Sequence, residues 1–251
     1  MAKRVPGLHS QGHGPDLVLL HGALVSSRMW QPQVEALSPH FTLHTLDLAA
    51  HSSAPDLDGD YTIEALAAEA ISRLQRAGLD NFHLCGHSLG GMVAQQIALQ
   101  APQRVNKLIL AESAFGTRNN AWESLQTAFA RPFLALTPLS TTIDLSVRQH
   151  SSLRPSTGAF LREEMQRYDK ATTLRVLRAA IDYAGKQHLS LIQAPTLILA
   201  ASENKATHGQ AREMAALIPN ARLEFIPKAK HLLNLDNPRA FNQALRAFLS
   251  H

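Results

Sequence analysis

The sequence has little of what several classes of protein need. Its 251 residues contain a single cysteine, Cys85, so a disulfide within the chain is excluded, and we expect Cys85 to be a small buried hydrophobe. Lysine and arginine never occur more than two in succession, which argues against a nucleic-acid-binding stripe despite the net charge of +4. The first ten residues include Lys3, Arg4 and Pro6 where a signal peptide or anchor would have an apolar segment. We therefore expect a cytoplasmic protein with no nucleic-acid partner and no membrane partner.

What is present is an alternation of short apolar segments and amphipathic ones. With 45% of its 251 residues apolar, the chain is long enough for one large core, so we expect one domain carrying an insertion. The short segments are continuously apolar, which predicts an α/β fold with a mostly parallel sheet and helices on both faces. The predicted strands are 17–20, 41–48, 82–85, 107–111, 196–201 and 223–226, with room for an edge strand around 5–10. The predicted helices are 63–76, 92–100, 209–217 and 238–249, the last with Asn237 as its N-cap and Pro238 at its first position.

One long segment interrupts this alternation. Between residues 115 and 188 only helical patterns occur, over 156–170 with Ser156 as a candidate N-cap and over 171–186. A helical insertion after a strand predicts a lid over the carboxyl edge of the sheet. We therefore expect a core of residues 1–114 and 189–251 and a helical cap of residues 115–188. Six apolar cap residues are candidates for lining a pocket, although packing of the cap onto the sheet is the better explanation for most: Trp122, Phe129, Phe133, Leu134, Leu136 and Phe160.

The most specific motif is Gly86-His87-Ser88-Leu89-Gly90. It follows an apolar strand and precedes a helical segment, which is the context of a nucleophile elbow. The flanking glycines leave room for a sharp, strained turn that lifts the Ser88 hydroxyl clear of the sheet. The N–H groups that open the next helix would then face a developing oxyanion. We interpret Ser88 as a functional serine rather than as part of a merely structural turn.

Together these features resemble the α/β-hydrolase superfamily, in the group of small single-domain members with a helical cap and a serine nucleophile. The resemblance rests on His21-Gly22 after a strand, on the Gly-x-Ser-x-Gly motif, and on His231 in the loop after the last predicted strand. It covers nearly the whole chain and is weakest in the cap. It implies an α/β-hydrolase fold with a sheet of about seven strands and a helical cap inserted after the strand that ends at Glu112. It also implies the chain order serine, acid, histidine.

The chemistry that the resemblance implies is acyl transfer to Ser88, with His231 taking its proton and later activating water. The backbone N–H groups of Ala23 and Leu89 would hold the oxyanion. No metal and no cofactor is implied. The expected partner is a small-molecule substrate, and the sequence leaves the oligomeric state open.

The acid that should follow the serine in chain order departs from the family pattern. Relatives usually place an aspartate three residues beyond a glycine after the strand 196–201, but the matching positions here are Ala201 and Asn204. Asparagine in place of this acid typically costs about 10⁴ in kcat because the histidine takes the wrong tautomer. Two carboxylates are available: Glu112, at a position where certain haloalkane dehalogenases carry their acid, and Glu203. We rank Glu112 first, Glu203 second and the absence of any acid third.

Two further histidines are expected to support the site rather than react. His21 would orient its own loop, and His87 would pack or form a hydrogen bond beside the elbow. A second departure from the family is Ala50-His51-Ser52, where relatives often have Gly-His-Gly. Without those glycines we expect this loop to have fewer left-handed conformations open to it and to be stiffer.

Three functions remain open at this point. The leading hypothesis is a serine hydrolase acting on a small ester, lactone or similar acyl bond. A carbon–carbon bond hydrolase or a lyase would use Ser88 and His231 chiefly for proton transfer. A hydrolase-like small-molecule receptor with a decayed triad is the third, and Asn204 permits it. One fold hosts many chemistries, so the sequence does not separate the three.

Overall fold

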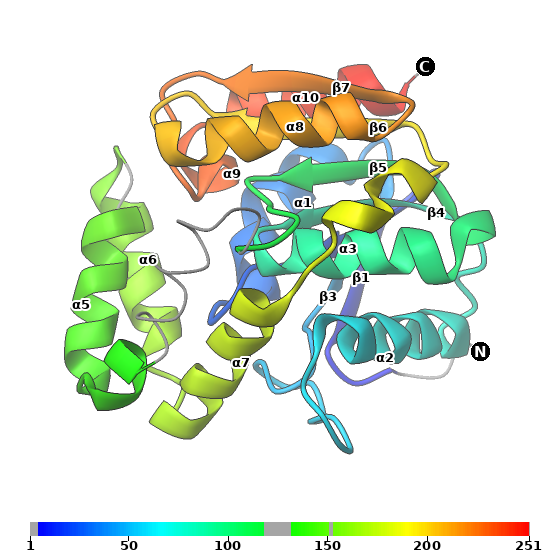
Figure 1. The fold of residues 1–251 in the computed structure, drawn as a ribbon. Coiled ribbons are helices and arrows are strands. Elements are labelled where there is room, and N and C mark those ends of the chain that lie inside the picture. Colours follow the sequence, from blue (N-terminus) through cyan, green and yellow to red (C-terminus); the bar gives the residue numbers. More distant parts are fainter. Residues whose placement is uncertain (1–4, 118–131, 151–152, 251) are drawn as a thin grey trace.

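A seven-stranded sheet forms the centre of the molecule (Figure 1). The computed structural model describes residues 5–117, 132–150 and 153–250. The strands are β1 (Leu8–Gly12), β2 (Asp16–Leu20), β3 (Thr42–Leu46), β4 (Phe82–His87), β5 (Val105–Ala111), β6 (Thr196–Ala201) and β7 (Ala221–Ile226). Their order in the sheet is β1-β3-β2-β4-β5-β6-β7, and only the β1–β3 pair is antiparallel. The predicted sheet of about seven mostly parallel strands is confirmed.

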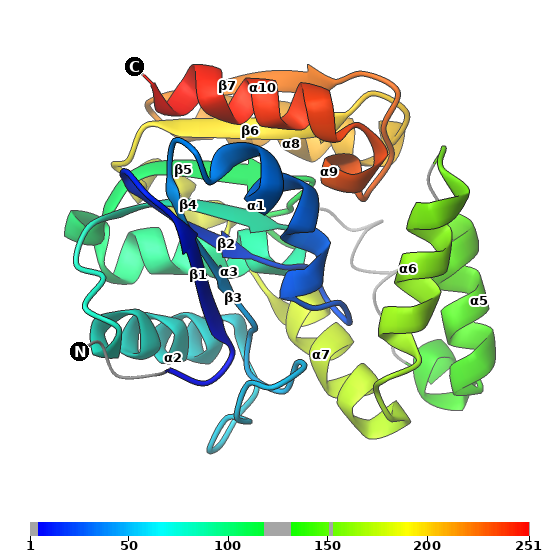
Figure 2. The same cartoon turned by 180° about the vertical axis from the view of Figure 1, so that it is seen from behind.

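Helices cover both faces of this sheet, as predicted. Those of the core are α1 (Gln31–Leu37), α2 (Ile63–Arg76), α3 (Leu89–Gln100), α8 (His208–Leu217), α9 (Leu233–Asp236) and α10 (Pro238–Leu249). Helices α2, α3 and α8 lie on the face seen in Figure 1, and α1 and α10 lie on the face seen in Figure 2. The sheet is therefore shielded from solvent on both sides.

The apolar strands are buried because they lie in the middle of these layers. All four residues of 17–20 in β2 are 0% exposed. Full burial of a Val or Leu side chain stabilises the fold by about 1.5–3 kcal/mol, so such a strand is disfavoured at an edge. Strand β1 does lie at the edge, and four of its five residues are exposed. It occupies Leu8–Gly12 rather than the predicted 5–10.

Helix starts follow local chemistry. Helix α3 begins at Leu89, three residues before its predicted start, because the turn at Ser88 leads directly into it. Helix α10 begins where it is predicted to begin. The side chain of Asn237 accepts a hydrogen bond from the N–H of Ala240 at 3.2 Å, and a proline follows at the first helical position.

Among the described residues between β5 and β6, three further α-helices lie together at one end of the sheet (Figure 1). They are α5 (Leu139–His150), α6 (Pro155–Met165) and α7 (Lys170–Asp182). The predicted helix over 156–170 is α6, which ends five residues earlier, and the prediction of Ser156 as its N-cap is wrong. Helix α6 starts at Pro155, with Arg154 in the N-cap position, because the fixed φ of proline suits the first helical position. The predicted helix over 171–186 is α7, and it ends four residues earlier.

Helix α2 is anchored by a buried arginine. The side chain of Arg73 is 0% exposed, and its guanidinium donates to the carbonyl oxygen of Asp47 at 2.8 Å and to that of Pro6. It also pairs with Glu69 on the same helix at 3.4 Å. These contacts join α2 to the N-terminal segment and to the loop that follows β3.

Replacing Arg73 with alanine leaves the Glu69 carboxylate and two carbonyl groups without this donor. We expect the free energy of unfolding to fall by about 3 kcal/mol, measured by urea denaturation. Arg76→Ala is the matched control, because Arg76 lies on the same helix but is exposed, where it contacts the Ser72 hydroxyl. The control should change stability by less than about 0.5 kcal/mol. Equal losses in the two variants would contradict the anchoring role of Arg73.

Candidate active site

Ser88 stands at a sharp turn between β4 and α3. Its backbone has a φ of 51° and a ψ of −117°, which a serine rarely adopts. The turn needs glycine on both sides, because a Cβ at Gly90 would clash with the carbonyl oxygen of Leu20 and one at Gly86 with that of Gly90. The strained turn that the motif predicts is therefore present.

His231 lies in the loop after β7 and reaches Ser88. Its Nε2 is 3.1 Å from Ser88 Oγ, within reach for proton transfer. The backbone around it is held from two sides. His87 Nε2 donates to the carbonyl oxygen of His231 at 2.7 Å, and the N–H of Lys230 donates to Asp236 Oδ2 at 2.8 Å. The expected supporting role of His87 is confirmed by the first of these bonds.

The carboxylate that faces the other nitrogen of His231 belongs to Glu112, directly after β5. Its side chain is 0% exposed, and Oε2 lies 3.3 Å from His231 Nδ1. Its φ of 45° is another strained backbone conformation. The N–H of Ala201 donates to Oε1 at 2.7 Å, Asn204 Nδ2 donates to Oε2 at 2.5 Å, and the Thr207 hydroxyl lies 3.1 Å from Oε1. The buried carboxylate thus has the several polar partners that a buried charge needs.

The second candidate acid lies elsewhere. Glu203 is exposed, and its Oε1 accepts a hydrogen bond from the Ser202 hydroxyl at 3.1 Å. Asn204, which occupies the usual position of the acid, directs its amide to Glu112 instead. The structure therefore brings Glu112 to His231 and leaves Glu203 at the surface.

Ala23 and Leu89 both border the cavity that contains Ser88. Leu89 is the first residue of α3, and the N–H groups of a first helical turn have no partner within their helix. The segment that carries Ala23 packs tightly on the elbow: a Cβ at Gly22 would lie 2.8 Å from His87 Nδ1 and 3.4 Å from Ser88 Cβ. Ala23 and Leu89 therefore border the same cavity as the serine, and their role at an oxyanion stays a prediction.

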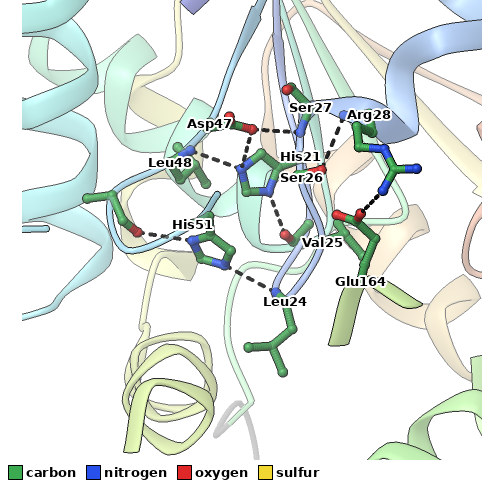
Figure 3. A network of polar contacts seen from close by, with 12 residues as sticks. His21, Leu24, Val25, Ser26, Ser27, Arg28, Asp47, Leu48, His51 and Glu164 are labelled. Atoms are coloured by element: carbon green, nitrogen blue, oxygen red, sulfur yellow. Dashed lines mark hydrogen bonds and ion pairs between the residues drawn. The ribbon is translucent and has the colours of Figure 1, made fainter. Parts of the chain in front are cut away.

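The segment after β2 is held by two buried histidines, of which His21 is the first (Figure 3). Its Nδ1 donates to the carbonyl oxygen of Gly22 at 2.8 Å, and its Nε2 accepts from the N–H of Leu48 at 2.9 Å. Burial lowers the pKa of His21 to about 4, so the ring is neutral at pH 7 and can donate and accept at once. The expected role of His21 in orienting its loop is confirmed.

His51 makes the corresponding contacts from the loop after β3. Its Nδ1 donates to the carbonyl oxygen of Ala49 at 3.0 Å, and its Nε2 accepts from the N–H of Leu24 at 3.2 Å (Figure 3). Burial, followed by the nearby His21 ring, lowers the pKa of His51 to about 3. The two ring centroids are 4.8 Å apart. The sequence motif places His51 near the site but does not indicate this bond to Leu24.

The backbone beside His51 differs from the prediction. Ala50 has a φ of 60° and Ser52 a φ of 49°, both in the left-handed region. Lacking glycine therefore does not keep these two residues out of the left-handed region, and the expected stiffness of the loop stays a prediction. The hydrogen bonds and the burial of His51 hold the two flanking residues in a conformation that they disfavour locally.

Helix α6 and the residues after it contact the same segment from the other side. Arg28 Nη1 donates to Glu164 Oε1 at 2.9 Å and to Glu163 Oε1 at 2.8 Å, and the side chain of Glu164 is 0% exposed. The Tyr168 hydroxyl donates to the carbonyl oxygen of Val25 at 3.2 Å. Figure 3 shows Glu164 reaching the Arg28 guanidinium. No sequence motif signals these contacts, because the partners lie more than a hundred residues apart.

A cavity of about 170 Å³ lies beside Ser88. Among the described residues its lining contains no Lys, Arg, Asp or Glu. Helices α5, α6 and α7 contribute Ser146, Leu161, Met165, Leu177 and Ala180. The cavity is therefore largely apolar and suits a small uncharged group.

Two of the six apolar residues predicted as pocket candidates, Trp122 and Phe129, lie outside the described residues. The other four are absent from this lining: Phe133, Leu134, Leu136 and Phe160. Phe133 and Leu136 are 56% and 84% exposed, and Phe160 packs partly buried against the core. The side chains that α5, α6 and α7 do contribute come from helix faces whose orientation the sequence pattern does not define.

The remaining expectations concern metals, membranes and the cysteine. Within the described ranges, no group of three or more His, Cys, Asp or Glu side chains is arranged to hold a metal ion. No helix in that part of the chain is long and apolar enough to cross a membrane. Cys85 is fully buried, and burial raises the pKa of its thiol, so it is a packing residue as predicted.

A second serine, histidine and aspartate group lies on β1, β3 and β2. Ser10 Oγ is 2.8 Å from His44 Nδ1, and His44 Nε2 is 2.8 Å from Asp16 Oδ1. Ser10 is exposed in the edge strand and contacts Nδ1 of its histidine rather than Nε2. It lies within a strand rather than at a strand-to-helix turn. Ser10 therefore serves as a control serine that contacts a histidine but is not at a nucleophile elbow.

A mostly parallel seven-stranded sheet with a serine at a strained strand-to-helix turn defines an α/β-type hydrolase. The chain belongs to the alpha/beta hydrolase family, whose sequence profile matches residues 17–244. The protein is thus an enzyme of the hydrolase class.

Similar proteins fit this assignment. The chain is 28% identical over 249 residues to a pimeloyl-[acyl-carrier protein] methyl ester esterase of Nitrosomonas europaea, with 93% of this chain and 95% of that protein covered. It is 30% identical over 251 residues to a putative carbamate hydrolase RutD of Serratia proteamaculans, with 94% and 91% covered. The crystal structure of a hydrolase from Pseudomonas aeruginosa PA01 superposes with a TM-score of 0.86 at 26% identity, covering 97% of this chain and 94% of that one.

The two neutral histidines make stability depend on pH. Their pKa values are lowered from the ordinary 6.5 to about 4 and about 3, so the unfolded chain binds more protons than the folded one below pH 6.5. The contribution of these two histidines to the free energy of unfolding is therefore fully present above about pH 6.5. It falls toward pH 4 by up to about 1.4 kcal/mol per pH unit for each histidine.

His51→Gln keeps an acceptor for the Leu24 N–H but does not titrate. We expect its loss of stability on acidification to be shallower than that of the wild type, measured by urea denaturation at several pH values from 7.5 to 4.5. His9→Gln, which replaces an exposed histidine on β1, is the control and should keep the wild-type slope. A wild-type slope in His51→Gln would exclude His51 as the group that takes up the proton.

Proposed function

We propose that this protein is a serine hydrolase that cleaves a small-molecule ester, lactone or related acyl bond through an acyl-enzyme on Ser88. His231 is the general base and Glu112 is its acidic partner. One side chain carries the proposal: His231 lies 3.1 Å from Ser88 Oγ through Nε2 and 3.3 Å from Glu112 Oε2 through Nδ1. These contacts join a nucleophile to a base and the base to an acid that orients it, which is the arrangement that nucleophilic acyl transfer needs.

In the first half-reaction Ser88 Oγ forms a bond to the acyl carbon while His231 Nε2 takes the hydroxyl proton. The N–H groups of Ala23 and Leu89 donate to the oxyanion that develops on the carbonyl oxygen. Collapse of this intermediate breaks the bond to the leaving group, which receives the proton from His231. The ionised Glu112 stabilises the imidazolium during both steps.

In the second half-reaction a water molecule attacks the acyl carbon of the acyl-enzyme. His231 Nε2 takes a proton from the water as the new carbon–oxygen bond forms. The oxyanion again lies against Ala23 and Leu89. Release of the acid breaks the bond to Ser88 Oγ, which recovers its proton from His231, so the enzyme returns to its starting state.

The cavity and the relatives support a small acyl substrate. The charge-free lining of about 170 Å³ favours an uncharged group next to Ser88. One relative is named for methyl ester hydrolysis and another for carbamate hydrolysis, and both reactions attack a carbonyl carbon. We further propose that residues 115–188 form a cap that, through α5, α6 and α7, shapes this pocket over a core of residues 1–114 and 189–251.

The alternatives have weaker support. A decayed receptor requires a triad without its acid, whereas Glu112 contacts His231 and is held by three further groups. A carbon–carbon bond hydrolase or lyase would use the same Ser88 and His231. The names of the relatives favour ester-type chemistry over these reactions.

Ser88 should be the residue that reacts with a broad fluorophosphonate probe, because the label needs an activated serine and no knowledge of the substrate. Intact-mass analysis should find one adduct on the wild-type protein and none on Ser88→Ala. Ser10→Ala is the matched control, since Ser10 also contacts a histidine that contacts an aspartate, and it should label as the wild type does. An adduct that survives Ser88→Ala, or no adduct on folded wild-type protein, would defeat the proposal.

Glu112→Gln should lower kcat for p-nitrophenyl butyrate by about 10⁴, because an amide does not stabilise the imidazolium. Glu203→Gln removes the other candidate carboxylate and should keep kcat within about twofold, since exposed charges contribute little. Steady-state kinetics of the two variants tests which carboxylate acts. The reverse order of effects would move the acid to Glu203.

A further inference from the structure

One contact of Glu112 is not used by the proposed mechanism. Asn204 Nδ2 donates to Glu112 Oε2 at 2.5 Å, and this is the oxygen that lies 3.3 Å from His231 Nδ1. The Thr207 hydroxyl also lies 3.3 Å from Oε2, so the amide is the nearest of three polar groups at this carboxylate oxygen. Because the Glu112 side chain is 0% exposed, solvent does not replace a donor that is lost. The amide thus determines where this oxygen lies relative to the imidazole.

Asn204 is itself held in the turn after β6. Its N–H donates to the carbonyl oxygen of Ala201 at 3.2 Å. Its own carbonyl oxygen accepts from the N–H of Thr207 at 3.2 Å and lies 2.9 Å from the Thr207 hydroxyl. The backbone of the turn therefore orients the side chain independently of Glu112.

The amide also differs from a carboxylate in charge. The NH₂ group of asparagine only donates, so it complements an ionised carboxylate. An aspartate at position 204 would place a second negative charge at hydrogen-bond distance from Glu112, and the two carboxylates would repel each other. The neutral amide at the usual position of the acid therefore donates to the Glu112 carboxylate without adding a second charge beside it.

We propose that Asn204 is a positioning residue, whose amide holds Oε2 of Glu112 directed at His231 Nδ1. This inference rests on the proposed function, since Asn204 acts only through Glu112. It means that the residue that departs from the family pattern positions the carboxylate of Glu112. Asn204 touches neither the substrate nor Ser88 in this proposal.

The charged and titratable groups around the pair come from three elements. His231 is faced by Glu112 after β5 and by His87 at the end of β4, whose ring centroid is 5.0 Å away. The turn after β6 contributes Asn204, which is neutral, and Glu203, which is exposed. A negative charge introduced at position 204 would be a second one close to His231, whereas removal of the Glu203 charge alters a group that faces solvent.

Asn204→Ala tests the positioning role by kinetics. We expect kcat for p-nitrophenyl butyrate to fall about tenfold with KM within about twofold, since a hydrogen bond to a charged group is lost away from the substrate. In the Glu112→Gln background the same substitution should change the rate of fluorophosphonate labelling by less than about twofold, because there is no anion left to position. Equal effects in both backgrounds would overturn the proposal.

Asn204→Asp tests the charge and is nearly isosteric, so it also serves if Asn204→Ala does not fold. The acidic limb of kcat/KM should move to higher pH by about one unit, because the added negative charge favours the protonated imidazole. Glu203→Gln is the matched control and should leave the limb where it is in the wild type. A merely structural Asn204 would change kcat without moving the limb, and an unmoved limb in Asn204→Asp overturns the inference.

The same experiments separate this inference from the function on which it rests. If wild-type protein neither labels nor hydrolyses the ester, or if Glu112→Gln keeps the full rate, the proposed function fails. If the wild type is active, Glu112→Gln is inactive and both Asn204 variants behave as wild type, the positioning role alone is wrong.

Discussion

A carboxylate buried at the end of β5 is the constraint on which the site depends. The Glu112 side chain is not hydrated by solvent, so groups from other elements must supply its hydrogen bonds. They come from the end of β6, from the turn that follows it and from the loop after β7. These segments meet because parallel strands deliver their carboxyl ends to one edge of the sheet. The neighbourhood of Glu112 is therefore a product of topology rather than of any local sequence.

The same topology explains how an acid can occupy a neighbouring strand end. Strands β5 and β6 are adjacent, with Ala111 paired to Leu199, and the N–H of Glu112 continues the ladder to the Leu199 carbonyl oxygen at 2.8 Å. Positions 112 and 204 consequently lie close together at the ends of two adjacent strands. The carboxylate of the first and the amide of the second form a hydrogen bond there. Two carboxylates would repel each other there, so the two departures from the usual pattern are physically linked.

A second constraint acts on the segment after β2, which carries Ala23. In the proposed mechanism the N–H of Ala23 donates to the oxyanion, and such a donor must be rigid, since reorganising it during the reaction would cost free energy. His21 and His51 supply this rigidity as neutral rings that donate at one nitrogen and accept at the other. Contacts from Glu164 and Tyr168 reach the same segment from α6 and the residues after it. The segment after β2 is thus held from one side by two buried histidines and from the other by Glu164 and Tyr168.

The sequence by itself determined the features that depend on neighbouring residues. The turn at Ser88 needs glycines two positions away on each side. The strands show as continuous apolar segments, and a proline after Asn237 marks the start of α10. The folded chain alone brings Glu112 rather than Glu203 to His231, places Asn204 against Glu112, and sets the left-handed backbone beside His51. It also divided the helices between β5 and β6, whose pocket-facing sides are invisible in the sequence. The physical reason is the same throughout: a buried polar group takes whatever partner the folded chain brings to it, and those partners lie tens to hundreds of residues away.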